Sequence, residues 1–262
     1  MLRKNFYRGA VFSAAVRLTG DKVTQNHRNM KKLGLFLIPA LAALLSACND
    51  DDGDYPRYTP LITTVRTIDA SGSDYYFQRD NGQTLYPSDK SRVAAYRATD
   101  RQRAVIWFNL LQGIQGYDYN IALYAVQEIY TGTSEEVDTP ARLEELGDSP
   151  ASITPAYCNL SDEWLTLYLG YPVMDNSKHD FTLIVNRVEA PEESHEGYLD
   201  VELRHNSGGD LAGYTQWYYV SFDLTPIAPL LEGKQGVTLK IKTQQNGTKY
   251  LRLERNPGSA AQ

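Results

Sequence analysis

The chain has 262 residues, with 26 basic and 32 acidic residues and a formal net charge of −6. It contains only two cysteines, which excludes a disulfide-rich fold and leaves burial of a core as the source of stability. A chain of this length can bury enough surface for that, and we expect two domains.

The N-terminal region has the pattern of a secretory signal. An apolar stretch at 33–45 follows Met30, Lys31 and Lys32 and precedes small residues. A membrane-spanning helix needs about 20 apolar residues, so this stretch is too short to span. A buried core helix is the alternative, but the basic flank and the small residues are typical of a signal peptide. Because a basic region should adjoin the apolar one, we expect Met30 to be the true start and residues 1–29 to lie outside the fold.

The signal region, residues 1–47, ends in a motif that is similar to a bacterial lipobox: Leu45, Ser46, Ala47 and Cys48. This likeness implies cleavage before Cys48 and acylation of its thiol, for example by palmitate. The mature protein would then be anchored to the outer membrane without spanning it. Acylation would leave Cys158 as the only free cysteine.

Residues 48–58 form an acidic segment that we expect to be a solvated tether, because like charges repel one another and extend a chain. Asp50, Asp51 and Asp52 also resemble the export signal of lipoproteins displayed on the surface of some Gram-negative bacteria. Without residues 1–47, the basic residues fall from 26 to 18 and the acidic ones from 32 to 31, a net charge of −13. Such a surface repels polyphosphate backbones, so we expect no nucleic-acid partner.

Residues 59–136 have the pattern of a small barrel. Alternating β-branched and aromatic residues predict five strands, at 61–68, 75–79, 83–86, 104–111 and 119–126. Asp80, Asn81 and Gly82 predict a hairpin turn between the second and third strands, because Asn-Gly tolerates a positive φ. Five strands in about seventy residues are typical of a closed or nearly closed barrel.

A short helix and linker are predicted at 137–151, between the two domains. Thr139 can cap the helix, Pro140 suits its first position and Gly147 can end it. Pro150 then marks the predicted domain boundary.

Residues 152–256 predict a second all-β domain. The alternating runs lie at 164–169, 181–188, 197–205, 217–224, 237–243 and 250–254. Six or seven strands at this spacing fit a β-sandwich. The order in which they pair stays open.

Several segments resemble the NigD-like lipoproteins: RDNGQTLYPS at 79–88, GYDYNI at 116–121, GYLDVELRHN at 197–206 and YVSFDL at 219–224. The likeness covers most of residues 48–255. It implies an all-β chain with an N-terminal OB-like barrel and a C-terminal β-sandwich. The family name comes from a bacteriocin gene cluster in which one member was proposed as an immunity protein. The resemblance brings no catalytic signature and implies a fold more firmly than a function.

Aromatic side chains are the first candidates for a binding surface. One residue of the pair Tyr117 and Tyr119, and one of the pair Trp217 and Tyr218, is expected in the core and the other at the surface, where aromatic rings contact proteins or glycans. Arg204 and His205 form a polar cluster at a predicted strand end. An anion or sugar site there is the alternative to the favoured interpretation, in which they fix a turn.

Catalysis and metal binding have little support in the sequence. His179, His195 and His205 are not spaced as metal ligands, so no metal site is expected. Cys158 has no evident base, and a Gly-x-Ser-x-Gly motif is missing. We therefore expect no cofactor and no enzymatic activity.

Two functional classes remain open. The first is an interaction module for a protein partner, with bacteriocin immunity as one form. The second is a glycan-binding accessory lipoprotein at the cell surface. A row of exposed aromatic rings would favour the glycan, whereas a flat patch with an apolar centre and a polar rim would favour a protein.

Overall fold

The computed structural model describes residues 59–174, 178–190, 195–210, 213–245 and 247–255. The predicted signal region, the lipobox with Cys48 and the acidic tether lie outside the described residues. The described part belongs to one compact unit, Tyr55–Gln262. Its secondary structure is almost entirely β, which confirms the predicted fold class.

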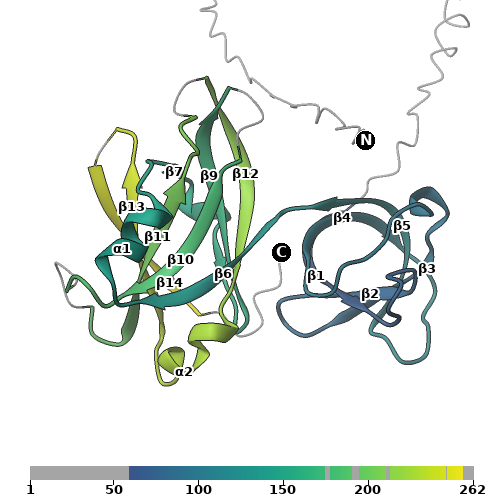
Figure 1. Cartoon of the computed structure of the whole chain (residues 1–262). Coiled ribbons are helices and arrows are strands. Elements are labelled where there is room, and N and C mark those ends of the chain that lie inside the picture. Colours follow the sequence, from purple (N-terminus) through teal and green to yellow (C-terminus); the bar gives the residue numbers. More distant parts are fainter. Residues whose placement is uncertain (1–58, 175–177, 191–194, 211–212, 246, 256–262) are drawn as a thin grey trace, which may run out of the picture. The chain divides into compact units, whose positions relative to one another are not determined.

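The N-terminal domain is a closed five-stranded barrel in the order β1-β2-β3-β5-β4, with β4 pairing back onto β1 (Figure 1). β3 and β5 run parallel, and the other neighbours are antiparallel. Alternate side chains such as Val65, Phe77 and Ile106 fill the barrel. The elements are β1 Thr59–Thr67, β2 Tyr75–Gln78, β3 Thr84–Asp89, the 3-10 helix η1 Ser91–Val93, β4 Arg103–Leu110 and β5 Tyr119–Glu128.

The predicted hairpin joins β2 to β3. The Arg79 N–H donates to the Gln83 carbonyl at 2.8 Å, and the Gly82 N–H donates to the Arg79 carbonyl at 2.9 Å. Gly82 has φ +87° and supplies the left-handed step, whereas Asn81 is not among the residues with positive φ. The turn therefore places Asp80 at the tip of the hairpin.

The C-terminal domain is a nine-stranded sheet in the order β14-β13-β11-β10-β6-β12-β9-β7, with β8 pairing to β9. Its strands are β6 Tyr130–Val137, β7 Ser152–Ile153, β8 Asn159–Leu160, β9 Trp164–Val173, β10 Asp180–Asn186, β11 Tyr198–Asn206, β12 Tyr214–Asp223, β13 Gly236–Thr243 and β14 Gly247–Glu254. Short helices connect them: α1 Pro140–Leu146, η2 Pro155–Tyr157, η3 Thr225–Ile227 and α2 Ala228–Leu231.

Strand β6 folds this sheet into a sandwich. Its first half, Tyr130–Thr133, pairs with β12, and its second half, Ser134–Val137, pairs with β10. A strand that changes partner in this way turns the corner between two layers. Leucine, valine and phenylalanine side chains from both layers then meet in one core cluster.

The split at β6 leaves the start of β10 without a strand on that side. The Tyr130 hydroxyl donates to the Phe181 carbonyl and accepts the Phe181 N–H, both at 3.0 Å. One side chain therefore satisfies two backbone groups that the sheet leaves unpaired.

The domain boundary differs from the prediction. Residues 130–136, expected in the barrel, belong to β6 of the sandwich, and only Ile129 separates β5 from β6 (Figure 1). Helix α1 and Pro150 therefore lie inside the second domain. The polar sequence of β6 does not indicate which sheet the strand will join, because its partners β10 and β12 lie far along the chain.

Helix α1 docks as its sequence predicts, with Leu143 and Leu146 buried against Val137 and Ile184. Gly147 follows the helix at φ +71°. Thr139 occupies the cap position, but its side chain makes no capping hydrogen bond.

Candidate functional site

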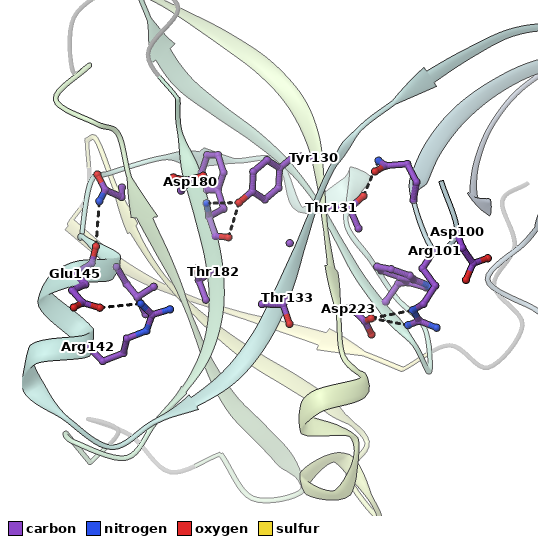
Figure 2. A pocket seen from close by; sticks show the side chains of 16 residues that line it. Asp100, Arg101, Tyr130, Thr131, Thr133, Arg142, Glu145, Asp180, Thr182 and Asp223 are labelled. Atoms are coloured by element: carbon purple, nitrogen blue, oxygen red, sulfur yellow. Dashed lines mark hydrogen bonds and ion pairs between the residues drawn. The ribbon is translucent and has the colours of Figure 1, made fainter. Parts of the chain in front are cut away.

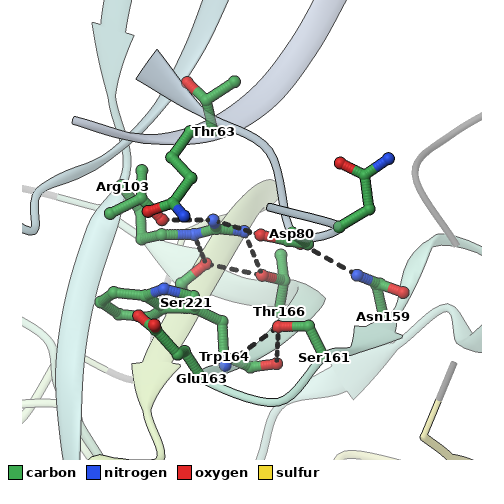
Figure 3. A network of polar contacts seen from close by, with 12 residues as sticks. Thr63, Asp80, Arg103, Asn159, Ser161, Glu163, Trp164, Thr166 and Ser221 are labelled. Carbon is green, nitrogen blue, oxygen red and sulfur yellow. Dashed lines mark hydrogen bonds and ion pairs between the residues drawn. The ribbon is translucent and has the colours of Figure 1, made fainter. Parts of the chain in front are cut away.

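The barrel meets the sandwich through Arg103, at the start of β4. The fully buried guanidinium donates to both Asp80 carboxylate oxygens, at 2.6 and 3.1 Å (Figure 3). It also donates to the hydroxyls of Thr166 on β9, at 3.2 Å, and Ser221 on β12, at 3.4 Å. Since Arg103 and Asp80 belong to the barrel, a buried ion pair of one domain is completed by hydroxyls of the other.

The same contact covers one end of the outer face of β9 and β12. Trp164 stacks under Arg101 and Arg103, with its ring centroid 5.2 and 5.1 Å from their Cζ atoms. Arg101 also donates to Asp223 at 2.7 Å. Strand pairing puts Trp164 opposite Asp223 and Thr166 opposite Ser221, so the barrel covers these two residue pairs.

Beyond the barrel the same face carries aromatic rings. Strand pairing places Tyr168 opposite Tyr219 and Gly170 opposite Trp217. Trp217 is nearly parallel to Tyr168, with ring centroids 5.4 Å apart and an angle of 26°, and Tyr219 lies 4.7 Å from Tyr168. Tyr157 of η2 packs edge-on against Tyr168 at 5.4 Å. We call Tyr157, Tyr168, Trp217 and Tyr219 the aromatic row.

Gly170 explains how the indole of Trp217 lies. A Cβ at Gly170 would come within 2.6–2.8 Å of three indole atoms, closer than any side chain could approach. The absence of a side chain lets the indole rest flat on the backbone of β9. One ring face is therefore packed, while Trp217 as a whole stays 40% exposed.

A polar groove of about 700 Å³ opens beside the β6 split (Figure 2). Tyr130, Thr131 and Thr133 of β6 line it, with Arg101 of the barrel at one end and Arg142 of α1 at the other. Figure 2 shows that its two arginines are engaged within the protein: Arg101 with Asp223, and Arg142 with Glu145 at 3.0 Å. Ion pairs already formed inside the groove make it a weaker ligand site than the aromatic row.

Comparison with known families identifies the chain. Residues 62–129 match the NigD-like N-terminal OB domain, and residues 134–255 match the NigD-like C-terminal beta sandwich domain. The chain belongs to the NigD-like family. No curated protein matches it.

Solved structures share the fold of this NigD-like chain. A protein of unknown function from Bacteroides vulgatus is 21% identical over 78% of this chain and 94% of that chain, with a TM-score of 0.65. A candidate lipoprotein from Bacteroides fragilis is 13% identical over 78% and 100%, with a TM-score of 0.56. A NigD-like immunity protein from Bacteroides caccae is 20% identical over 76% and 92%, with a TM-score of 0.51. Identities this low indicate a shared fold only.

The predicted residues Tyr117 and Tyr119 of this NigD-like chain lie on the barrel. Tyr117, in the loop before β5, stacks on Tyr86 at 4.8 Å and packs against Tyr76 at 5.5 Å. The Tyr119 hydroxyl accepts a hydrogen bond from Gln83 at 3.1 Å. These rings and hydroxyls are used within the barrel, which favours a structural role for both tyrosines.

Arg204 and His205 also have internal partners. Arg204 donates to Glu202 at 2.7 Å and to the Leu143 carbonyl of α1 at 3.0 Å. His205 is buried and stacks on Phe181, with ring centroids 4.3 Å apart. Burial, together with the neighbouring His179, lowers the pKa of His205 to about 4. These contacts hold α1 against the end of β11 and use both side chains within the fold.

Trp217 and Tyr218 lie on opposite faces of β12, as predicted, but both are exposed, at 40% and 37%. Tyr218 contacts Tyr171 at 5.5 Å near the open end of the core. The sequence analysis missed Tyr157 and Tyr168. The alternation of 164–169 contained a signal, because Tyr168 lies between the buried Leu167 and Leu169.

Other kinds of site find little support in the described part of the chain. There, no group of three or more His, Cys, Asp or Glu side chains could hold a metal ion. Cys158 is half-buried, and burial raises the pKa of its thiol, which makes it less nucleophilic at neutral pH. No helix of the described residues is both long and apolar enough to cross a bilayer.

Proposed function

We propose that this NigD-like chain is a non-enzymatic lipoprotein of the outer membrane that acts as a binding module. The aromatic row carries the proposal. Four aromatic side chains line one sheet face directly beside a region that the barrel covers, and Tyr157 and Trp217 are 58% and 40% exposed. Exposed Tyr and Trp clusters are typical of binding surfaces.

Lipid anchoring at Cys48 is supported by the lipobox-like motif and by the fold shared with a candidate lipoprotein. Cys48→Ser should abolish incorporation of labelled palmitate and move the protein from the envelope fraction to the soluble fraction. Cys158→Ser is the matched control, because the thiol of Cys158 is half-buried within the fold and should not be acylated. Unchanged palmitate labelling of the Cys48 variant would refute the anchor.

The partner class has two candidates, a protein and a surface glycan. The fold shared with a NigD-like immunity protein supports a protein partner such as a bacteriocin or its receptor. Deleting the gene and challenging cells with culture supernatants of related strains tests this role, and unchanged sensitivity would count against immunity. Surface display is tested separately by labelling intact cells with a membrane-impermeant reagent.

The aromatic row itself can be tested on intact cells with a photo-crosslinking residue at Trp217. Tyr214 is the matched control, since it lies on the opposite face of the same strand and is 87% exposed. An adduct from position 217 and none from position 214 supports binding through the row, whether the adduct is a discrete protein band or a heterogeneous polysaccharide band. Equal labelling from both positions, or none, argues against it.

A further inference from the structure

We propose that the aromatic row binds a neutral polysaccharide chain, with sugar rings stacked on Trp217 and Tyr168. This inference rests on the proposed binding function and names its ligand class. The rings of the row are held in place on a sheet face by Gly170 and by one another, unlike an aromatic side chain that protrudes from a loop.

Trp217 is 40% exposed, and Tyr168 is partly exposed beside it. Trp217 lies on Gly170 with one face packed, and Tyr168 lies nearly parallel to it, 5.4 Å away. The face of an aromatic ring carries partial negative charge, which attracts the weakly positive C–H groups of a pyranose face. Two nearly parallel rings on neighbouring strands therefore suit a ligand with repeated flat faces.

The described residues beside the rings are uncharged as far as the barrel edge, where the Asp80 carboxylate accepts a hydrogen bond from Asn159 at 3.0 Å. The same face carries Gly170 and Pro172 on β9 and Thr215 on β12, and Ser152 of β7 pairs with Gly170. Asn159 of β8 pairs with Thr166, at the end of the row that adjoins the barrel. Ser152 and Thr215 supply hydroxyl groups that can bond to sugar hydroxyls, and neither residue gives a charge to hold an ionic ligand. The predicted mature chain is strongly acidic elsewhere, so this face is set apart by its neutrality.

The barrel offers no comparable surface on its aromatic side. OB-type barrels bind ligands on the face of strands 2 and 3 and on the adjacent loops. Here Tyr117 from the loop before β5 already stacks on Tyr86 of β3 and packs against Tyr76 of β2. Tyr76, Tyr86 and Tyr117 are all only partly exposed, whereas Tyr157 and Trp217 are 58% and 40% exposed. The sandwich is therefore the better candidate for the binding domain.

Affinity electrophoresis of residues 49–262 in native gels tests the proposal. All strands in the described part of the chain lie between residues 59 and 254, so this lipid-free chain keeps both cores. The gels would contain hydroxyethylcellulose, xylan, galactomannan or soluble starch, with polygalacturonate as a charged comparison. At least one neutral polysaccharide should retard the protein in a concentration-dependent manner.

Variants locate the site. Trp217→Ala should weaken binding by about tenfold or more, as truncation of a central aromatic contact does. Gly170→Ala keeps all four rings but lifts the indole off the backbone, and it should also weaken binding. Tyr214→Ala, an equally drastic change on the other face of β12, should bind like the unaltered chain. Circular dichroism would establish that each variant is folded.

Two outcomes overturn the proposal: no retardation by any neutral polysaccharide, or retardation that persists in folded Trp217→Ala. If either occurs while position 217 still gives a discrete protein adduct on intact cells, the ligand class is wrong and the binding function stands. If the crosslinking also fails, the proposed function falls with it.

Discussion

The buried ion pair at the domain junction gives the sharpest stability prediction. Replacing Arg103 with Leu keeps an apolar side chain in place but leaves the Asp80 carboxylate, only 12% exposed, without its cation. Removing one partner of a buried pair costs about 3–5 kcal/mol, because the remaining charge loses its cation while it stays largely buried. The Asn159 amide still donates to Asp80 at 3.0 Å, which places the expected loss toward the lower end of that range. The loss of the Arg103 hydrogen bonds should cost the Thr166 and Ser221 hydroxyls less, because these hydroxyls lie 2.8 Å apart and keep their hydrogen bond to each other.

Equilibrium unfolding in urea would measure this loss, followed by tryptophan fluorescence and by circular dichroism. Coincident transitions would justify a two-state free energy of unfolding. Arg66→Leu is the matched control: Arg66 pairs with Glu163 at 3.0 Å, but that carboxylate is 48% exposed. An exposed pair contributes about 0–1 kcal/mol, so this variant should be close to the unaltered chain.

The partner substitution makes the reasoning refutable. Asp80→Asn removes the uncompensated charge, so adding it to Arg103→Leu should recover part of the lost stability. If Arg103→Leu costs less than about 1 kcal/mol, or if the second substitution simply adds its own penalty, then the ion pair does not hold the junction in the way argued here.

Two further predictions concern the sandwich. Tyr130→Phe leaves the N–H and C=O of buried Phe181 without the hydroxyl that serves both, and it should cost about 1–3 kcal/mol in the same assay; no loss would mean that water replaces the hydroxyl. Burial lowers the pKa of His205 to about 4 from an ordinary 6.5. Between these two pH values the unfolded chain binds a proton at this imidazole and the folded chain does not. Stability is then present above pH 6.5 and falls by about 3 kcal/mol toward pH 4, each pKa unit being worth about 1.4 kcal/mol. In His205→Gln this loss is absent, so the stability gap between the two proteins should narrow as pH falls; a constant gap would contradict the assignment.

The fold class could be predicted because each domain leaves a local trace in the sequence. Period-2 alternation marks the barrel strands, and Gly82 marks their hairpin. The domain boundary left no such trace. β6 is polar and pairs in two halves with strands that lie about fifty and ninety residues further along the chain, and no local pattern encodes pairings so distant.

The aromatic row depends on two features that the local sequence does not determine: which face of the sheet the barrel covers, and the register of β12 against β9. Alternation predicts that Trp217 and Tyr218 face opposite sides of β12, but not which side the barrel covers. Register brings Gly170 under the indole, and Arg103, far away in the sequence, determines where the barrel's cover ends. A one-residue slip of β12 against β9 would pair Trp217 with Leu169 or Tyr171 and turn the indole to the core side of the sheet. The row is therefore a product of strand register and domain contact together, which is why the sequence could name Trp217 as a candidate but could not assemble the surface around it.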